Sequence, residues 1–509
     1  MKKGFVYLVG AGPGRAELIT VRGAEILKAA DCVLCDKLAN SALLRFARKD
    51  TELLHVPKRT AEGGSTQDEI NRLIVEKALA GKTVVRLKGG DPCIFGRASD
   101  ELGVLSEAGI GFEIVPGVTA GVGMAAYAGI MLTDKQYSSQ VMFVTGHEAT
   151  GRRETAIDWD VLGKFHGTMV FYMGIGNLDS IVQRLIENGM SEDTPAALVA
   201  NATFPTQRLV KASLGTLKHQ CEHQKVEPPA LVVIGGVADS DDQLNWYMRK
   251  TLFGRNIVVT RDAAGNADFA GKIINRGGNP VEFATIRIES RTDSNEFLQA
   301  MAEFSQYDWI IFTSGNGVMI FFEGLDGLGK DARAFGSAKV AAIGSSTAGK
   351  LAEFGIKADF VPDVFTGREL GRQLLGFTNL RDKKVLLLRS AIASNELVDV
   401  LAEGGAQVDN VAVYTASEVK SDTSALVESL GEGTIDWVTF ASPSSVDGLL
   451  GQVPSGLINS SKAQVASIGP VTSGRLKELG VKVDVTAAAH TIDGLLDSIE
   501  QEELRYGFS

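Results

Sequence analysis

The chain has little cysteine, with four residues in a total of 509. So few cysteines cannot form a disulfide framework, and their scarcity predicts a protein of the reducing cytoplasm. Cys32 and Cys35 have the CxxC spacing, but they lie within an apolar run and no second pair completes a zinc site. We therefore expect a buried, structural CxxC pair and no bound metal.

Long hydrophobic runs are absent as well. No window offers about 18 uninterrupted apolar residues, and the first residues lead into a strand-like sequence rather than a signal peptide. The hydrophobic content of 44% and the charged content of 22% are typical of soluble globular proteins. These features predict that the protein does not associate with a membrane.

The chain also lacks an excess of positive charge, since it contains 51 basic and 62 acidic side chains and its net charge is −11. Residues 1–250 hold 28 basic and 29 acidic side chains, whereas the remainder holds 23 and 33. Because no basic face is evident, we expect no binding to nucleic acid. Any anionic ligand must be held by local donors rather than by the overall field.

Two glycine-rich motifs each lack a residue that nucleotide binding requires. Residues 10–14 resemble the start of a dinucleotide fingerprint, but Arg15 occupies the position of the third glycine. Residues 344–350 resemble a P-loop, yet Leu351 stands where a hydroxyl should bind magnesium. We expect no flavin. A dinucleotide-dependent oxidoreductase remains an alternative that titration with NADPH would test.

Strand-like apolar runs alternate with helix-length segments in the first half, which predicts the α/β class. The runs occupy residues 6–9, 32–35, 83–87, 141–144, 169–172, 196–199 and 230–234. A chain of this length is expected to form two to four domains. A polar stretch follows residue 238 and a new strand begins near 256, so the main boundary is predicted between 238 and 254.

The second half contains an internal repeat. Residues 308–314 recur as 436–442 at an offset of 128, and residues 340–344 recur as 465–469 at an offset of 125. Residues 258–261 also match 386–389. Three matching segments in the same order predict two similarly built α/β lobes rather than a solenoid, which would need shorter and more numerous repeats.

The segment 83–97 is the most informative about function. A β-branched strand leads to Gly89 and Gly90, where a ligand can approach bare backbone, and Pro92 prevents the strand from continuing. Residues 114–120 repeat this plan of strand, Pro-Gly break and small polar residue. Two such breaks at successive strand ends predict the edge of a cleft in an α/β sheet, although a pair of ordinary turns is the alternative.

Turns between strand and helix in the second half carry small hydroxyl residues. Ser314 and Ser442 begin two of these turns, and residues 344–350 and 469–476 form two more. A helix N-terminus stabilises an anion by about 0.3–1 kcal/mol, and a charge-assisted hydrogen bond adds about 1.5–3 kcal/mol. Several converging turns would hold a polycarboxylate, and simple helix capping is the alternative.

The first half resembles uroporphyrinogen-III C-methyltransferase, a member of the tetrapyrrole methylase family. The resemblance covers residues 5–238 and rests on an ordered set of segments: 9–14, 17–20, 36, 57–59, 67–71, 86–97, 115–120, 126–130, 145–147, 172–174 and 228–230. It implies a domain over 1–245, with α/β lobes of about 1–117 and 118–245 and S-adenosylmethionine between them. The implied donor-binding residues are Pro13, Gly89, Gly90, Asp91, Ile94, Thr119, Ala120, Met173 and Ala202.

The same resemblance implies that Asp36 accepts a proton and that Lys58 is the candidate proton donor. A pyrrole carbon that attacks a sulfonium methyl group must be aligned with it, and a proton must then leave the ring system. In the alternative interpretation Asp36 caps the following helix and Lys58 binds a substrate carboxylate. The resemblance also implies a homodimer through this half.

The second half resembles uroporphyrinogen-III synthase. The similar segments are 259–261, 312–314 with Asn316 and Val318, and 411–415. The resemblance implies a domain over 254–509 with discontinuous lobes, one of about 254–285 plus 418–509 and one of about 286–417. The crossings near Ile286 and Tyr414 would then form a hinge.

The implied substrate of this half is hydroxymethylbilane, a linear tetrapyrrole with eight carboxylates. Tyr414 would donate a hydrogen bond that assists loss of the substrate hydroxyl, and Arg261, Thr313, Ser314 and Ser442 would bind the substrate. Packing at the hinge is the alternative role for Tyr414.

Together the two resemblances predict a cytoplasmic bifunctional enzyme. The second half would cyclise hydroxymethylbilane to uroporphyrinogen III, and the first half would methylate that product at C2 and C7 to precorrin-2, for sirohaem or cobalamin. One alternative is a methylase of a later precorrin, joined to a second half that binds anionic tetrapyrrole without catalysis.

Overall fold

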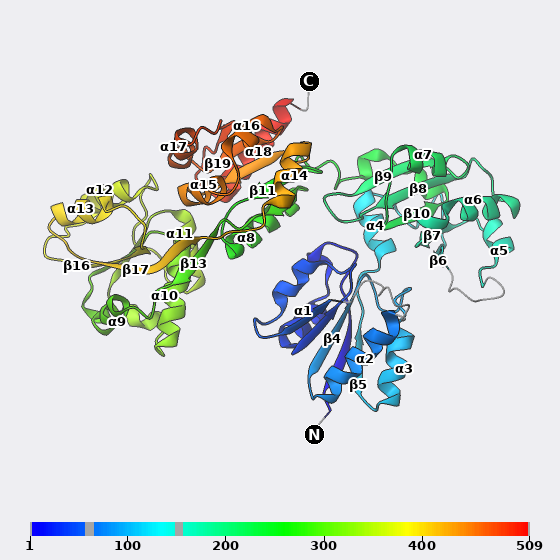
Figure 1. The fold of residues 1–509 in the computed structure, drawn as a ribbon, viewed down its shortest axis with the longest axis horizontal. Helices are drawn as coiled ribbons and strands as arrows, with labels where there is room; N and C mark the ends of the chain where they lie inside the picture. Colours follow the sequence, from blue (N-terminus) through cyan, green and yellow to red (C-terminus); the bar gives the residue numbers. More distant parts are fainter. Residues whose placement is uncertain (1–2, 56–65, 148–155, 507–509) are drawn as a thin grey trace. The chain divides into compact units, whose positions relative to one another are not determined.

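The computed structural model describes residues 3–55, 66–147 and 156–506. The chain divides into two compact units, Met1–Gly254 and Arg255–Ser509 (Figure 1). In the described ranges each unit contains two five-stranded sheets with helices packed against them, so the α/β class is confirmed.

The first sheet is parallel and has the strand order β3-β2-β4-β1-β5. Its strands are β1 (Phe5–Gly10), β2 (Cys32–Cys35), β3 (Glu52–His55), β4 (Thr83–Lys88) and β5 (Gly111–Val115). The helices around it are η1 (Ala16–Leu18), α1 (Val21–Ala29), η2 (Ser41–Phe46), α2 (Thr66–Leu79) and α3 (Ala98–Glu107). Two hydrophobic clusters, one on each face, explain why its central strands are mostly apolar, with Arg86 and Lys88 of β4 as buried exceptions.

The second sheet is mixed and has the order β6-β7-β10-β8-β9. Its strands are β6 (Val141–Thr145), β7 (Thr168–Tyr172), β8 (Pro195–Ala200), β9 (Arg208–Ser213) and β10 (Ala230–Ile234). Its helices are α4 (Ala120–Ala128), α5 (Trp159–Gly163), η3 (Ile175–Asn177), α6 (Leu178–Glu187), α7 (Leu217–His223), η4 (Gly236–Asp239) and η5 (Asp242–Leu244).

The segment after η5 packs onto the first unit. The Trp246 indole donates to the carbonyl of Ala126 at 2.9 Å, and the fully buried Tyr247 ring contacts Tyr127 and Phe253. These aromatic contacts hold the end of the first unit in place.

The second unit contains one parallel and one mixed sheet. The parallel sheet has the order β12-β11-β18-β19-β20, with β11 (Asn256–Val259), β12 (Asn279–Glu282), β18 (Trp437–Phe440), β19 (Gln464–Ser467) and β20 (Val485–Thr486). Its helices are α8 (Ala263–Asn275), α14 (Ser424–Glu432), α15 (Pro443–Leu450), α16 (Ser455–Ser460), α17 (Pro470–Glu478) and α18 (Ile492–Tyr506).

The mixed sheet has the order β13-β17-β16-β14-β15, with β13 (Ile286–Ser290), β14 (Trp309–Phe312), β15 (Lys339–Ala342), β16 (Lys384–Ser390) and β17 (Gln407–Glu418). Its helices are α9 (Asn295–Ala302), η6 (Phe304–Gln306), α10 (Gly315–Gly327), η7 (Ala332–Phe335), α11 (Ser345–Glu353), α12 (Gly367–Phe377) and α13 (Glu396–Glu403). Figure 1 shows β13 and β17 side by side, and they pair antiparallel.

The internal repeat corresponds to equivalent strands of these two sheets. Asp308 precedes β14 and accepts the backbone N–H of Lys384 at 2.9 Å, while Asp436 precedes β18 and accepts that of Asn256 at 2.7 Å. In both sheets the aspartate joins the start of its strand to the strand beside it. The internal repeat therefore correctly predicted that the second unit contains two similarly built α/β lobes.

The CxxC pair is buried in β2, where burial raises the pKa of both thiols. This agrees with the structural role predicted for Cys32 and Cys35. In the ranges 3–55, 66–147 and 156–506 no helix has the length and apolar character that a membrane span needs.

Candidate functional site

Three strand ends of the first sheet meet through glycines. A Cβ atom on Gly10 would lie 2.6 Å from the Cα of Gly117 and 2.8 Å from the carbonyl oxygen of Gly90. Gly90 also exchanges two backbone hydrogen bonds with Gly12, of 2.8 and 3.2 Å. The carboxyl ends of β1, β4 and β5 can therefore pack backbone against backbone only because these positions lack side chains. We call Gly10, Gly90 and Gly117 the glycine crossing.

The loop after β1 joins this crossing to the second sheet. Pro13 packs so closely on α4 that a Cβ on Gly123 would lie 2.3 Å from its Cγ. The backbone N–H of Arg15 donates to the hydroxyl of Thr203 at 2.9 Å. Pro13 is therefore fixed where the layers of the two sheets meet.

Asp91 ties the loop after β4 to the end of β5. One carboxylate oxygen accepts the N–H of Cys93 and the other accepts the N–H of Gly117, each at 2.8 Å. Both oxygens are used by backbone groups, so Asp91 shapes the glycine crossing. Its role in binding a methyl donor remains a prediction.

The remaining predicted donor residues gather around the Tyr172 phenol. The Tyr172 hydroxyl hydrogen-bonds with the Thr119 hydroxyl at 2.8 Å and accepts the N–H of Gly121 at 2.7 Å. Three apolar members pack, partly buried, against the hydrophobic cluster that contains Tyr172, namely Ile94, Ala120 and Ala202. Met173 directly follows Tyr172, is half exposed and has a φ of 55°. Left-handed backbone in a residue other than glycine is costly and is typical of functional sites.

This set of residues fits a methyl donor of the S-adenosylmethionine type. All nine predicted donor residues retain some exposure to solvent. The absence of a side chain at Gly89 lets a ligand approach the backbone closely, and Ile94, Ala120 and Ala202 offer an apolar wall. A few polar groups in an apolar surround are the usual composition of a cofactor site.

Asp36 lies beside this edge of the sheet. It follows β2, its backbone N–H donates to the carbonyl of Leu87, and its neighbour Leu38 lies 3.0 Å from where a Cβ on Gly89 would be. The Arg86 guanidinium donates from Nη2 to Asp36 Oδ1 at 2.5 Å. Asn40, and not Asp36, caps the helix that follows. The structure thus places Asp36 beside the end of β4, and Leu38 beside Gly89.

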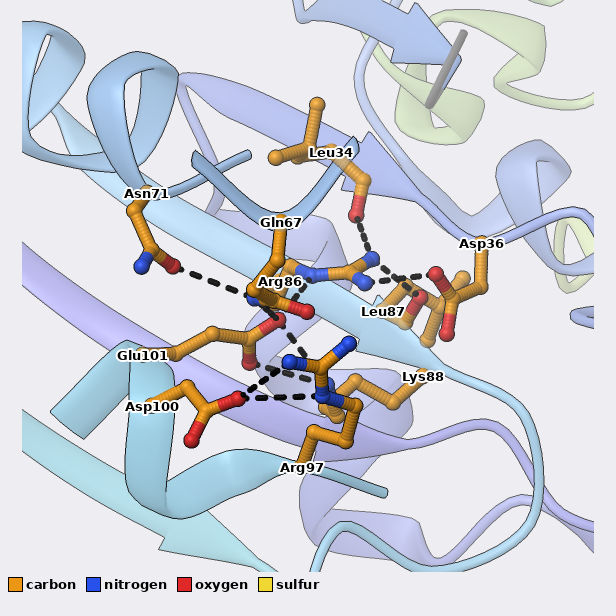
Figure 2. Close-up of polar contacts among 10 residues, drawn as sticks. All are labelled: Leu34, Asp36, Gln67, Asn71, Arg86, Leu87, Lys88, Arg97, Asp100 and Glu101. Atoms are coloured by element: carbon orange, nitrogen blue, oxygen red, sulfur yellow. Dashed lines mark hydrogen bonds and ion pairs between the residues drawn. The ribbon is translucent and has the colours of Figure 1, made fainter. Parts of the chain in front are cut away.

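Arg86 belongs to a buried network of charges that Figure 2 shows from β4 to α3. Arg86 Nε donates to Glu101 Oε1 at 2.9 Å, and Lys88 Nζ reaches both oxygens of Glu101 at 2.9 Å. Burial alone would lower the pKa of Arg86, but the charges of Asp36 and Glu101 raise it overall. Burial and the neighbouring Arg86 lower the pKa of Lys88.

Lys58, the predicted proton donor, lies outside the described residues. Sequence reasoning missed the site roles of Tyr172, Arg86, Lys88 and Glu101. Two basic residues in an otherwise apolar strand were the available signal for Arg86 and Lys88, because such residues are rarely buried without partners.

In the second unit, Tyr414 lies at the carboxyl end of the mixed sheet. A β-bulge between Arg389 and Ser390 places Ser390 opposite Tyr414, and bulges often redirect side chains at functional sites. The Tyr414 hydroxyl lies 2.9 Å from Ser314 Oγ, which also accepts the N–H of Gly317 at the start of α10. Burial raises the pKa of Tyr414, while its hydrogen bonds to Ser314 and Ser390 oppose that shift.

The other predicted substrate residues are placed as follows. Arg261 follows β11 and is partly exposed, and it precedes Asp262, whose charge also raises the pKa of Tyr414. Thr313 is partly buried and precedes Ser314. Ser442 uses its hydroxyl in a capping box with Ser445 at the start of α15. The structure therefore brings Ser314 and Tyr414 together, and both Ser314 and Ser442 cap the helices that follow them.

Comparison with known proteins gives a separate family match in each of the two compact units. The family of tetrapyrrole (corrin/porphyrin) methylases matches residues 6–218, and the family of uroporphyrinogen-III synthase HemD matches residues 267–497. A porphyrin biosynthesis protein HemD of Ruminiclostridium josui is 36% identical over 501 residues, 98% of each chain.

Two further proteins are similar to part of this chain. A uroporphyrinogen-III C-methyltransferase of Bacillus subtilis (strain 168) is 38% identical over 325 residues, 64% of this chain and 66% of the other. The crystal structure of a uroporphyrin-III C-methyl transferase from Thermus thermophilus, complexed with S-adenyl homocysteine, is 35% identical, with 46% of this chain and 94% of the other covered at a TM-score of 0.39.

Both domain families are thus present in the order that the residues predict, and one relative spans nearly the whole chain. The chain belongs to the family of the porphyrin biosynthesis protein HemD, with a tetrapyrrole methylase domain followed by a uroporphyrinogen-III synthase domain.

Proposed function

We propose that the first unit methylates uroporphyrinogen III at C2 and C7 to give precorrin-2. The observation that carries this proposal is the position of Asp36 directly after β2, where its backbone N–H donates to the carbonyl of Leu87, two residues before Gly89. A site for methyl transfer needs both a cradle for the donor and a nearby base, and these residues supply the two.

When bound, S-adenosylmethionine supplies an electrophilic methyl group. The glycine crossing and the apolar wall of Ile94, Ala120 and Ala202 hold the donor in a fixed orientation. Such alignment is worth about 7–11 kcal/mol of the barrier. Asp36 then accepts a proton from the methylated macrocycle, which removes the positive charge that the transferred methyl group brings.

For the second unit we propose cyclisation of hydroxymethylbilane to uroporphyrinogen III. Tyr414 donates a hydrogen bond to the departing hydroxyl group, and its buried phenol stays protonated because burial raises its pKa. The start of α10, with Ser314 at its cap, contributes N–H groups toward a substrate carboxylate. Arg261 follows β11 of the parallel sheet and Thr313 follows β14 of the mixed sheet, and both are proposed to bind further carboxylates of the substrate.

We further propose that the two reactions are consecutive, because the product of the second unit is the substrate of the first. Precorrin-2 leads to sirohaem or cobalamin, and the enzyme works in the cytoplasm as a homodimer through the first unit.

The methylation is tested with the full chain, uroporphyrinogen III and S-adenosylmethionine labelled in its methyl group. We expect two labelled methyl groups per macrocycle, located at C2 and C7 by NMR. Asp36→Asn should lower the rate by about 10²–10⁴ while S-adenosylhomocysteine still binds. Labelling at a carbon other than C2 or C7 would contradict the proposal. Methylation of a later precorrin but not of uroporphyrinogen III would contradict it as well.

A further inference from the structure

Arg86 is the most constrained cation of the first unit. Only 2% of its side chain is exposed, and each of its three nitrogens has a partner. Nε donates to Glu101, Nη2 to Asp36, and Nη1 to backbone carbonyls at 3.3 and 3.4 Å. A lysine has a single nitrogen and cannot span these directions, so the planar guanidinium is specifically required.

The charges of the network balance only if Asp36 is included. Arg86 and Lys88 are two buried cations, and Glu101, which is fully buried, is one buried carboxylate between them. A buried charge without a counter-charge is costly. Asp36 supplies the second negative charge, so the network fixes Asp36 in place as much as Asp36 stabilises the network.

The ion pair occupies one oxygen of Asp36 and leaves the other available. Oδ1 accepts from Arg86, and within the part of the chain that the structure describes Oδ2 accepts no hydrogen bond. The Asp36 side chain is 29% exposed, unlike the other three members of the network. Figure 2 shows Asp36 at one end of the network, with Arg86 between Asp36 and Glu101.

We infer that Arg86 is a positioning residue for methylation: it anchors Oδ1 of Asp36 so that Oδ2 faces the substrate, and Glu101 holds Arg86 in turn. This inference rests on the proposed function of the first unit. In each transfer a carbon–carbon bond forms as the sulfur–carbon bond breaks, which releases S-adenosylhomocysteine and leaves a positive charge on the macrocycle. A proton then passes from the macrocycle to Oδ2, and its bonding electron pair stays behind and cancels that charge.

The test is a double-mutant cycle in the full chain, with Arg86→Lys, Asp36→Asn and the double variant. The methylation kcat for uroporphyrinogen III is measured at saturating S-adenosylmethionine. We expect Asp36→Asn to lower kcat by about 10²-fold or more and Arg86→Lys to lower it at least about tenfold, with the KM for S-adenosylmethionine unchanged. In the Asp36→Asn background, Arg86→Lys should change kcat by no more than about twofold.

A purely structural role for Arg86 gives a different pattern, in which Arg86→Lys lowers kcat equally in both backgrounds. That result, or a fully active Arg86→Lys variant, would overturn the inference. Glu101→Gln serves as the second variant if Arg86→Lys does not fold, and it should show the same dependence on Asp36. Circular dichroism and calorimetry with S-adenosylhomocysteine verify that each variant is folded.

Arg22→Lys is the matched control, because Arg22 makes an exposed ion pair with Glu113 on the same sheet. Its kcat should equal that of the unchanged chain. If the unchanged chain does not methylate uroporphyrinogen III, the proposed function fails and this inference fails with it. If the unchanged chain is active and the losses are additive, the inference alone fails.

Discussion

Tyr414 is the residue on which the proposed cyclisation depends. Its hydroxyl hydrogen-bonds with Ser314 Oγ, which also accepts the N–H of Gly317 in the first turn of α10. The phenol is therefore held at a helix start, where substrate carboxylates are expected. The bulge in β17 explains why it points to this position and not into a neighbouring layer.

Tyr414→Phe should lower the rate of cyclisation by about 10², because the ring is kept and only the donor is lost. Methylation of supplied uroporphyrinogen III should be unchanged. Chromatographic separation of type III from the spontaneous type I product measures the effect. An unchanged rate would show that Tyr414 has only a packing role where β13 and β17 pair.

The pKa of Tyr414 gives a second prediction. Burial raises this pKa above its usual value of 10.0, so the phenol remains a hydrogen-bond donor across the neutral and mildly alkaline range. The cyclisation rate, measured from pH 7 to pH 9.5 against the spontaneous rate, should show no decline from loss of a phenolic proton. A decline centred near pH 8 would contradict a buried tyrosine donor.

The sequence predicted single residues unevenly. Asp36 directly follows β2, as the apolar run at 32–35 predicted, whereas Tyr414 lies within β17. The partner of Arg86 could not be predicted, because Glu101 lies on α3 and the pairing depends on how that helix packs on β4. Helix capping by Ser442 was one of two alternatives that the sequence left open, since one hydroxyl serves a cap or an anion with the same local sequence.

Among the elements, the ends of β1, β4 and β5 depend on the glycine crossing. A Cβ on Gly117 would lie 2.3 Å from the carbonyl oxygen of Gly90, and neither backbone can move without disturbing Asp91. Gly117→Ala should therefore lower the free energy of unfolding by about 1–3 kcal/mol and abolish calorimetric binding of S-adenosylhomocysteine.

Gly103→Ala is the control for that substitution. Gly103 lies exposed on α3, and nothing surrounds the position of a new Cβ within 4 Å. Alanine there should stabilise the unit by about 0.5–1 kcal/mol and leave binding unchanged. Equal behaviour of the two variants in urea denaturation and calorimetry would show that the crossing does not form the donor cradle.

The repeated aspartates at the strand starts allow a prediction about pH. The side chain of Lys383 and the backbone N–H of Lys384 hold the pKa of Asp308 below its usual range. A carboxyl group whose folded pKa is lowered stabilises the fold above its unfolded pKa, and the contribution disappears as the pH falls through the folded value.

Asp308→Asn should thus cost about 1 kcal/mol of unfolding free energy at pH 7, and the difference from the unchanged chain should vanish in strong acid. Urea denaturation at pH 7 and pH 2.5 measures both values. Asp326→Asn, an exposed change on α10, should have little effect at either pH. A cost for Asp308→Asn that is independent of pH would contradict the ionic role.

The elements themselves were largely predictable. The apolar runs at 83–87 and 230–234 became the central strands β4 and β10, because strands covered on both faces need continuous hydrophobic sequence. β3 and β9 were not predicted. Both lie at sheet edges and carry charged residues such as Glu52 and Arg208, which the apolar periodicity cannot distinguish from loop.

For the whole molecule, each of the two compact units contains the match to one of the two families. Residues 1–254 and 255–509, expressed separately, should each fold, because each unit contains its own hydrophobic clusters. The second fragment should form type III product and the first should methylate it. A 255–509 fragment that binds tetrapyrrole but yields only type I product would indicate a binding module.

The most direct measurement supplies the whole chain with hydroxymethylbilane and methyl-labelled S-adenosylmethionine and identifies the tetrapyrrole by mass and NMR. The account predicts a doubly methylated type III macrocycle that forms without added uroporphyrinogen III. Type I uroporphyrinogen without methyl groups, produced at the spontaneous rate, would contradict it.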